Sequence, residues 1–201
     1  MVIKSKKKKS EFSLLEEYKL CWNYIKDSKN FIYFIMAIFV FFILVGFFLP
    51  VPETLAEQIF KFIQELIDKT KDLSQIELIK FIFLNNIQSS FVGMLFGVVL
   101  GIFPIIGAIF NGYLIGFVAA YSVESGGFLV LLNLVPHGIF ELPAIFLSLG
   151  LGLRLGMFVF EKNRFKKFSI YFLNSLRVFI LIVLPLLIIA ALIEGSLIFL
   201  Q

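Results

Sequence analysis

The sequence predicts an all-α, polytopic helical membrane protein with about five transmembrane helices. It is 60% hydrophobic, has 27 phenylalanines among its 201 residues, and has a mean hydropathy of +0.98. Soluble domains are about 45–50% apolar, so this composition excludes an ordinary soluble domain. No charged residue occurs from Phe81 to Val123, a stretch much longer than the roughly 20 residues that one crossing needs.

Residues 1–30 are predicted to form a cytoplasmic basic tail and an amphipathic helix that lies in the membrane interface. Residues 1–9 are rich in lysine, which favours the cytoplasmic side of the membrane and attracts anionic lipid. Over residues 13–29, apolar side chains recur at helical spacing and charges occupy the other face, which is typical of an interfacial helix. Cys21 is the only cysteine, which excludes an internal disulfide and a cysteine-based metal cluster.

A helical membrane domain is predicted over residues 31–200. Pro50 and Pro52 end its first helix, because proline cannot continue the helical hydrogen-bonding pattern. Residues 50–78 form an excursion with helical periodicity and more acids than bases, which suits a surface helix on the extracytoplasmic side. The predicted spans are residues 31–49, 79–103, 105–121, 128–160 and 178–199.

Two basic segments predict the topology. The lysine tail and a loop at residues 161–177 have the densest positive charge, and short basic segments stay in the cytoplasm. Four of the predicted crossings separate these segments, so both lie on the same side of the membrane. The N-terminus is therefore predicted to be cytoplasmic and the C-terminus extracytoplasmic, in a multi-pass protein of the cell membrane.

Glycines predict where the helices pack most closely. Small residues four positions apart let two membrane helices bring their backbones together. Twelve of the 14 glycines lie between Gly93 and Gly156, which predicts a core of the second, third and fourth helices, with the first and fifth at the periphery. The second and third helices are predicted to form a tight hairpin with its turn at residues 104–107. The candidate packing residues are Gly93, Gly97, Gly101, Gly112 and Gly116.

The most unusual stretch is residues 135–144, which place a histidine and an acid in apolar sequence. As one helix, the span around it would be about 50 Å long, well beyond a hydrocarbon core of about 30 Å. A discontinuous helix with its break at Pro136–Gly138 is therefore predicted. Pro136 suits the first turn of the second piece. His137 and Glu141 then lie one turn apart on the same face.

Pro143 removes a helical hydrogen bond and is expected to bend this helix, which leaves the carbonyl of Ile139 free. Amides in membrane helices seek hydrogen-bonding partners, so nearby amides are candidates to satisfy that carbonyl. These candidates are Asn85, Asn86, Gln88 and Asn111.

Four roles for His137 and Glu141 stay open: a hydrogen-bonded lock of the kink, a proton or ion site of a transporter, a metal site, and general acid–base catalysis. A catalytic zinc site is poorly supported, because the chain has one histidine and no nearby cysteine. No motif marks Ser89 or Ser90 as a nucleophile, so no catalytic residue is assigned. No metal and no cofactor is predicted. Glu194, the other acid in a membrane segment, is expected at the periphery.

Several of these motifs, taken in their order along the chain, are typical of one family. They are Asn85-Asn86, Asn111-Gly112, Pro136-His137-Gly138 with Glu141-Leu142-Pro143-Ala144, and Gly150. Over roughly residues 31–200 the chain resembles the stage II sporulation protein M family of integral membrane proteins. The resemblance implies a five-helix membrane protein, and the family's namesake anchors a peptidoglycan-remodelling complex and recruits cell-wall hydrolases. Members also occur in organisms that make no spores, so sporulation is not implied.

The favoured function is a membrane scaffold or assembly factor, which makes an enzyme the less favoured class. The main alternative is a permease-like subunit that moves a small solute or ion past His137 and Glu141, and the third is an intramembrane hydrolase. The sequence has no nucleotide-binding loop, so energy-coupled transport would need a separate ATPase or an ion gradient. The expected partners are membrane lipid and other membrane or envelope proteins, with a homo-oligomer left open and no nucleic acid.

Overall fold

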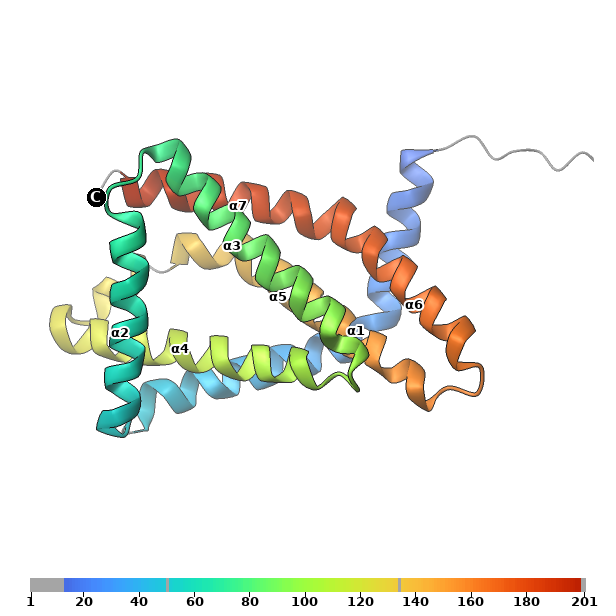
Figure 1. Cartoon of the computed structure of the whole chain (residues 1–201), viewed down its shortest axis with the longest axis horizontal. Helices are drawn as coiled ribbons and strands as arrows, with labels where there is room; N and C mark the ends of the chain where they lie inside the picture. The colour runs from blue at the N-terminus through green and yellow to red at the C-terminus, as the bar shows by residue number, and fades with distance from the viewer. Residues whose placement is uncertain (1–12, 50, 134, 200–201) are drawn as a thin grey trace, which may run out of the picture.

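The computed structural model describes residues 13–49, 51–133 and 135–199, and no strand occurs among them (Figure 1). Five of the described segments are long and apolar enough to cross a membrane, which confirms the predicted all-α polytopic fold. These segments are Leu14–Phe48, Gln75–Val98, Ile102–Gly126, Gly138–Phe160 and Arg164–Phe199.

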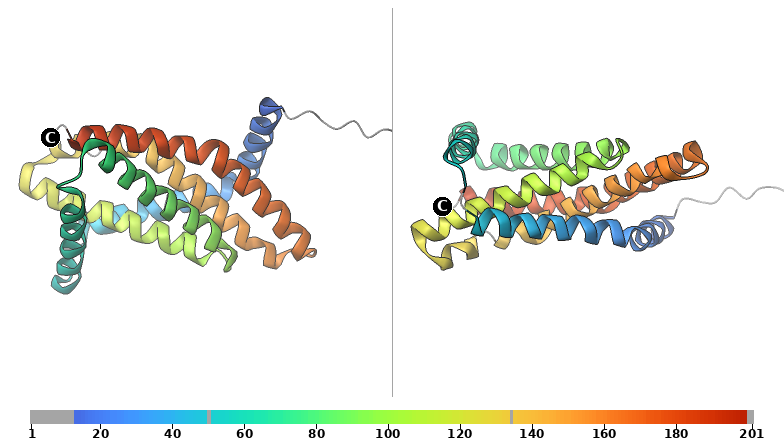
Figure 2. Two further views of the ribbon diagram at one scale, coloured as in Figure 1. Left: turned by 45° about the horizontal axis from the view of Figure 1, so that its top comes forward. Right: turned by 90° about the horizontal axis from the view of Figure 1, so that it is seen from below.

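The helices run back and forth between two ends of an elongated bundle (Figures 1 and 2). In chain order they are α1 (Leu14–Phe48), α2 (Glu53–Thr70), α3 (Gln75–Leu95), α4 (Ile102–Gly126), α5 (Val135–Gly156), α6 (Arg164–Val178) and α7 (Leu184–Phe199). Short 3₁₀ segments are Phe96–Val98 after α3, Phe128–Asn133 before α5 and Met157–Phe160 after α5. We call the end of the bundle with residues 99–101 and 161–163 the turn end, and the opposite end the α2 end.

The predicted interfacial helix at residues 13–29 and the predicted span at residues 31–49 are one helix, α1. No proline or glycine separates them, so nothing in the backbone ends one helix before the next begins. The N-terminal part of α1 stands at an angle to the rest of the helix (Figure 2). The Ser28 hydroxyl donates to the carbonyl of Tyr24 at 2.7 Å, and such bonds from a side chain back to its own helix bend helices.

The turn between α3 and α4 lies at residues 99–101, and the predicted turn at residues 104–107 is wrong. Leu100 and Gly101 have positive φ angles of 53° and 71°, which reverse the chain direction. Pro104 lies in the first turn of α4, where a backbone N–H has no partner within the helix. Proline therefore starts this helix instead of ending the preceding one.

The fourth span is discontinuous, and its break precedes Pro136. α4 continues to Gly126, and the chain then reverses at Gly127, which has a φ of 77°. A 3₁₀ segment at Phe128–Asn133 forms the short first piece, and α5 starts anew at Val135. The break thus lies slightly earlier in the chain than the sequence predicted.

The predicted basic loop at residues 161–177 is mostly helical. After a turn at residues 161–163, α6 runs into α7 through a π-helical stretch, Phe179–Val183. Pro185 lies at the start of α7 and cannot donate to the carbonyl of Leu181. The wider π turn directly before it accommodates the proline ring without ending the helix.

α5 runs through the middle of the bundle. In its most apolar window 50% of the residues are buried, against 22% to 33% in the other spans. α4 lies along α1, α3 lies along α7, and α5 packs against all four (Figures 1 and 2). α3 and α4 therefore diverge from their turn, and the predicted tight hairpin is wrong. α1 and α7 both pack against the central helix α5, so the predicted peripheral positions of the first and fifth membrane helices are also wrong.

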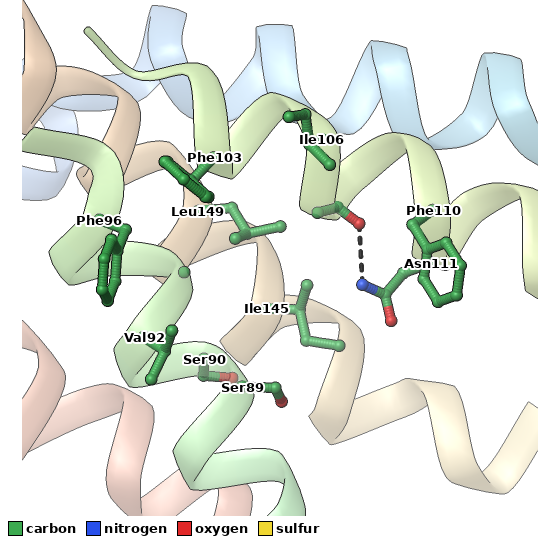
Figure 3. Close-up of a pocket in the computed structure, with 12 residues that line it drawn as sticks. Ser89, Ser90, Val92, Phe96, Phe103, Ile106, Phe110, Asn111, Ile145 and Leu149 are labelled. Carbon is green, nitrogen blue, oxygen red and sulfur yellow. Dashed lines mark hydrogen bonds between the residues drawn. The ribbon is translucent and has the colours of Figure 1, made fainter. Parts of the chain in front are cut away.

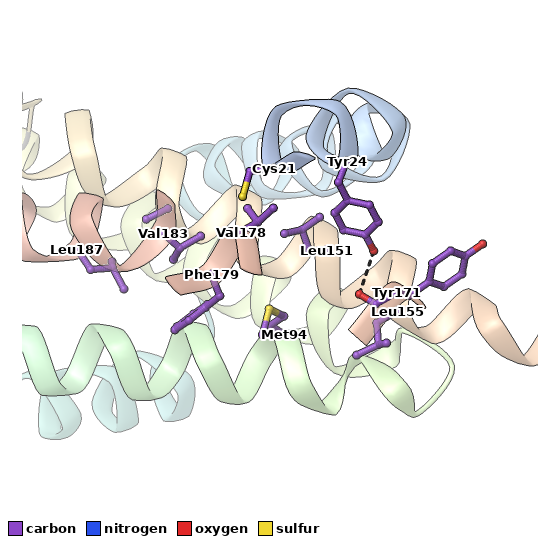
Figure 4. Packing of buried hydrophobic residues seen from close by; sticks show 11 residues of the cluster. Cys21, Tyr24, Met94, Leu151, Leu155, Tyr171, Val178, Phe179, Val183 and Leu187 are labelled. Atoms are coloured by element: carbon purple, nitrogen blue, oxygen red, sulfur yellow. Dashed lines mark hydrogen bonds between the residues drawn. The ribbon is translucent and has the colours of Figure 1, made fainter. Parts of the chain in front are cut away.

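The largest apolar cluster lies near the turn end, where α3, α5, α6 and α7 meet the N-terminal part of α1 (Figure 4). Met94, Leu151 and Leu155 are at most 1% exposed. Val178 and Leu187 complete the cluster from the other side and are fully buried. Burial of such side chains contributes about 1.5–3 kcal/mol each in soluble proteins, whereas in lipid the same contacts stabilise mainly through close packing.

Candidate functional site

The predicted motif at residues 135–144 forms the first turns of α5. Pro136 lies in the first turn, where its missing N–H leaves no helical acceptor unpaired. The helix continues through Pro143, which is exposed, and Glu141 is half-buried. The side chain of His137 lies outside the described residues, so the pairing of His137 with Glu141 stays a prediction.

A second carboxylate lies within electrostatic range of Glu141. Glu194 on α7 was expected at the periphery, but it is half-buried and its charge acts on the Glu141 carboxyl. Two carboxylates of like charge repel each other strongly in a low-dielectric interior, so such a pair favours a proton or a cation between its members. The described residues contain no group of three or more His, Cys, Asp or Glu side chains that could hold a metal ion.

Polar side chains of α3 line the same half of the bundle. Gly97, on the 3₁₀ segment after α3, contacts the backbone of Gly152 on α5. α3 and α5 run in the same direction (Figure 1), and Asn86 precedes Gly97 by as many residues as Glu141 precedes Gly152. Asn86 is 9% exposed and thus lies at about the depth of Glu141, facing the interior. Asn85 is exposed and donates to the side-chain oxygen of Asn86 at 3.4 Å.

The predicted packing glycines lie at the closest helix contacts. A Cβ on Gly97 would overlap the backbone of Gly152, and one on Gly93 would come within 2.7 Å of a Leu149 methyl group. Glycines of α4 meet α1 instead: a Cβ on Gly112 would overlap the carbonyl of Phe39. These contacts bind α3 to α5 and α4 to α1, rather than α3 to α4.

Three further glycines differ in their contacts. A Cβ on Gly116 would overlap the carbonyl of Ile43 on α1, which continues the α4–α1 contact. Gly101 belongs to the turn, where its left-handed backbone is more restrictive than its contact with Leu153. Gly138 of the predicted motif meets only the side chain of Leu142 in its own helix, at 3.2 Å, so it marks no close contact between helices.

A crevice of about 310 Å³ opens between α3 and α4 where they diverge, with α5 as its floor (Figure 3). The rings of Phe96 and Phe103 lie at its turn end, with 5.4 Å between their centroids. We call it the α3–α4 crevice. Its lining residues are Ser89, Ser90, Val92, Gly93, Phe96, Phe103, Ile106, Gly107, Phe110, Asn111, Ile145 and Leu149.

Hydrogen-bonding side chains face this crevice. Asn111 donates to the carbonyl of Gly107 in its own helix at 2.8 Å, and not to the carbonyl of Ile139 as the sequence suggested. Ser89 donates to the carbonyl of Asn86 at 3.2 Å. Ser90 is 3% exposed, and its hydroxyl oxygen has no hydrogen-bond partner among the described residues. The crevice thus combines apolar walls with unmet hydrogen-bonding capacity.

A polar network that the sequence reasoning missed joins α1 to α5 near the turn end. Arg154 on α5 donates to the Ser28 hydroxyl at 2.7 Å and to the carbonyl of Tyr24 at 3.1 Å. Its guanidinium also lies 4.2 Å from the centroid of the Tyr24 ring, a cation–π contact. The signal was available, because Arg154 is the only base between Phe128 and Phe160 and a charge in a membrane helix needs partners.

The same network continues to α6. The Tyr24 hydroxyl lies 3.2 Å from the carbonyl of Tyr171 (Figure 4) and 3.2 Å from the hydroxyl of Ser175. The Tyr171 hydroxyl donates to Glu161 at 2.7 Å, and this bond, with the nearby Lys167 ammonium, holds the pKa of Glu161 below its usual range. These bonds tie α1, α5 and α6 together at the turn end.

Comparison with known families identifies the chain. The model of the family described as Stage II sporulation protein M matches residues 35–197, which is well over half of the chain. The chain belongs to the stage II sporulation protein M family. No match is found among the curated proteins or among the solved structures.

The region matched by the stage II sporulation protein M family model contains the crevice, both carboxylates and Arg154. Tyr24 and Ser28, which accept hydrogen bonds from Arg154, precede that region. The N-terminal part of α1 is therefore joined to the matched region through this network.

Proposed function

We propose that this member of the stage II sporulation protein M family is a non-enzymatic scaffold or assembly factor that anchors an envelope-remodelling complex in the cell membrane. The observation that carries the proposal is α2, which lies across the end of the bundle and leaves one face exposed (Figure 1). The resemblance supports the same role, because the namesake of the family anchors a peptidoglycan-remodelling complex.

One face of α2 holds the helix against the bundle. Ile59 is buried, and Ile63 and Leu66 follow it at helical spacing and are half-buried. The ring of Phe60 packs edge-on against Phe117 and Tyr121 of α4, with 5.3 Å and 4.9 Å between centroids. Edge-to-face pairs of this kind stabilise a contact by about 0.5–1.5 kcal/mol each, so α2 is held in a defined position.

The opposite face of α2 is free for a partner. It is exposed and polar, with the acids Glu57, Glu65 and Asp68 beside Lys61, and Lys71 pairs with Asp68 at 3.0 Å. A rigid, charged helix presented outside the spans suits recognition of a protein surface of opposite charge, since complementary charge gives specificity and speeds encounter.

The proposal includes the orientation of the chain. Lys162, Arg164 and Lys166 are exposed at the turn end, and short basic segments stay in the cytoplasm. The α2 end then faces the extracytoplasmic side, where cell-wall enzymes work. The predicted cytoplasmic tail at residues 1–9 lies outside the described residues.

Purification of the full-length protein from its native membrane, with identification of the proteins that accompany it, tests the scaffold. We expect an envelope protein such as a cell-wall hydrolase, and we expect Glu57→Ala with Glu65→Ala to lose it. The matched control is Lys162→Ala with Lys166→Ala at the turn end, which should retain it. Recovery of an ATPase in place of envelope proteins would contradict the scaffold.

One observation favours a second candidate, a permease-like subunit. The charge of Glu194 acts on the half-buried Glu141, and carboxylates that interact at membrane depth are a common means of binding a proton or cation. On this alternative the pair is the working site, and both carboxylates are needed for activity in a protein that folds without either of them.

A further inference from the structure

A patch of positive charge lies at the turn end, where α5 gives way to α6 (Figure 1). Lys162, Arg164 and Lys166 are exposed there, and none of the three forms an ion pair with a described residue. Glu161 is the nearest acid in the sequence, and its carboxylate already lies 3.7 Å from the Lys167 ammonium. Three neighbouring cations therefore lack a counter-charge among the described residues, so they attract an anion from outside the protein.

Two exposed phenylalanine rings accompany these cations. Phe165 is 92% exposed and Phe160 is 71% exposed, and a shallow hollow of about 430 Å³ lies over residues 162–166. Positive charge alone is enough to keep a short loop in the cytoplasm, so topology does not account for the rings. Basic side chains beside exposed apolar rings are typical of segments that lie among the headgroups of a membrane.

Hydrogen bonds at the turn end indicate how far the patch lies from the hydrocarbon core. The Tyr24 hydroxyl lies 3.2 Å from the Tyr171 carbonyl, and Tyr24 is on the angled part of α1, shortly before the apolar run that begins at Phe31. Tyr171 therefore lies near the edge of the core. Lys166 precedes Tyr171 by five residues in α6, or about 7.5 Å at 1.5 Å per residue. Because the headgroup layer extends about 5–7.5 Å beyond the core on each side, Lys166 lies at the level of the lipid phosphates.

This level favours a lipid over a protein as the source of the anion. Phospholipids surround the bundle here at high local concentration, and a cytoplasmic protein would have to displace them to reach Lys166. The headgroup of a zwitterionic lipid carries an ammonium beside its phosphate, and a cluster of cations repels that ammonium. An anionic phospholipid, which has no such group, complements the charge of the patch best.

We propose that Lys162, Arg164 and Lys166 bind the phosphate of an anionic phospholipid, with the Phe165 ring against its glycerol backbone. The lipid belongs to the leaflet at the turn end, which is the cytoplasmic leaflet in the proposed orientation. Bound there, it fixes the turn between α5 and α6 at the membrane surface. Since α5 is the central helix, the lipid also sets the depth of the bundle in the bilayer. The site does not depend on the scaffold function or on a partner of α2.

Lipid titrations of the full-length protein in detergent test the site. Phosphatidylglycerol and phosphatidylcholine with identical acyl chains are added separately, and native mass spectrometry counts the lipids bound at each concentration. Each basic residue near an anionic lipid strengthens binding about fivefold, so three predict a preference of about 100-fold for the first phosphatidylglycerol. Lys162→Gln with Arg164→Gln should reduce this preference to about fivefold.

A second pair of lysines at the same end of the bundle provides the matched control. Lys19→Gln with Lys29→Gln removes two exposed lysines of α1, the same amount of charge, and should keep the full preference. Phe165→Ser should weaken both lipids by the same factor and leave the preference unchanged, because the glycerol backbone is common to both. Melting temperatures measured without added lipid verify that each variant is folded.

Equal affinity of the wild-type protein for the two lipids would overturn the site and would leave the patch to an acidic cytoplasmic protein. An equal loss of preference in the α1 control would also overturn it, because the preference would then come from the net charge of the whole turn end. Unchanged binding of both lipids to Phe165→Ser would contradict the position given to the ring. None of these results bears on the scaffold, which is tested by the proteins recovered with the chain.

Discussion

Replacing Gly97 with alanine tests whether α3 and α5 meet backbone to backbone. The new Cβ would overlap the carbonyl oxygen, carbonyl carbon and Cα of Gly152, and none of these atoms belongs to a flexible side chain that could move aside. The two helices must therefore separate, which also weakens the contacts on either side, because dispersion falls steeply over 0.5–1 Å. Overpacking of this kind costs about 1–3 kcal/mol.

Gly107→Ala is the matched control, because it makes the same chemical change in a neighbouring helix. Its Cβ meets only Leu149 methyl groups at 3.5 Å and 3.8 Å, which are ordinary contacts. Alanine also favours a helix over glycine by up to about 1 kcal/mol, so this variant should be neutral or more stable. The two variants should then differ by about 1–4 kcal/mol in the free energy of unfolding in detergent micelles. Equal stabilities would refute the close contact of α3 with α5.

Three further predictions concern the turn end and the topology. Arg154→Met should lower the free energy of unfolding by about 1.5–3 kcal/mol, because it removes the hydrogen bonds that the guanidinium donates to the Ser28 hydroxyl and the Tyr24 carbonyl. Arg154→Lys should recover only part of this loss. The pKa of Glu161 is lowered in the folded protein. Its contribution to stability is therefore complete above its ordinary pKa of about 4.3 and is lost as the pH falls through the lower folded value. Denaturation measured between pH 3 and 7 should show this loss of stability, and the variant Glu161→Gln should not show it. Cysteines placed at Glu65 and Lys166 should be labelled from opposite sides of the membrane, and labelling from one side would contradict five spans.

The number and kind of helices could be predicted from the sequence, because long apolar runs bounded by charges and prolines have few other solutions. The positions at which the helices begin and end were harder to predict. Pro104 reads as the end of a helix, yet a proline in a first turn costs nothing, and no pattern marks Leu100 for a left-handed backbone. The basic residues after Phe160 suggested a loop, although lysine and arginine are good helix formers and the segment is amphipathic.

In the candidate site too, the sequence indicated some of the residues but not the contacts that they make. The sequence marked Gly97 and Gly112 as packing residues, but spacing alone could not show that they meet different helices, α5 and α1. It marked Glu141 but not its neighbour Glu194, because only the antiparallel return of α7 brings the two together. Arg154 is the residue that could have been found, since it is the only lysine or arginine in an apolar helix.

The variant Glu141→Gln tests the scaffold most directly against transport and catalysis. It keeps the shape of the side chain and a hydrogen-bonding group, but it removes the ionisable acid. The measurement is the ability of the variant to replace the wild-type protein in its native cell, together with its folded yield and the envelope proteins recovered with it. Glu141→Ala serves as the comparison, because on the predicted lock it leaves His137 without its partner and should lose stability, by about 1–3 kcal/mol. The scaffold predicts that Glu141→Gln folds, recovers the same neighbours and supports function. A stably folded Glu141→Gln protein that recovers its neighbours but has no function would contradict the scaffold and assign the Glu141–Glu194 pair a working role.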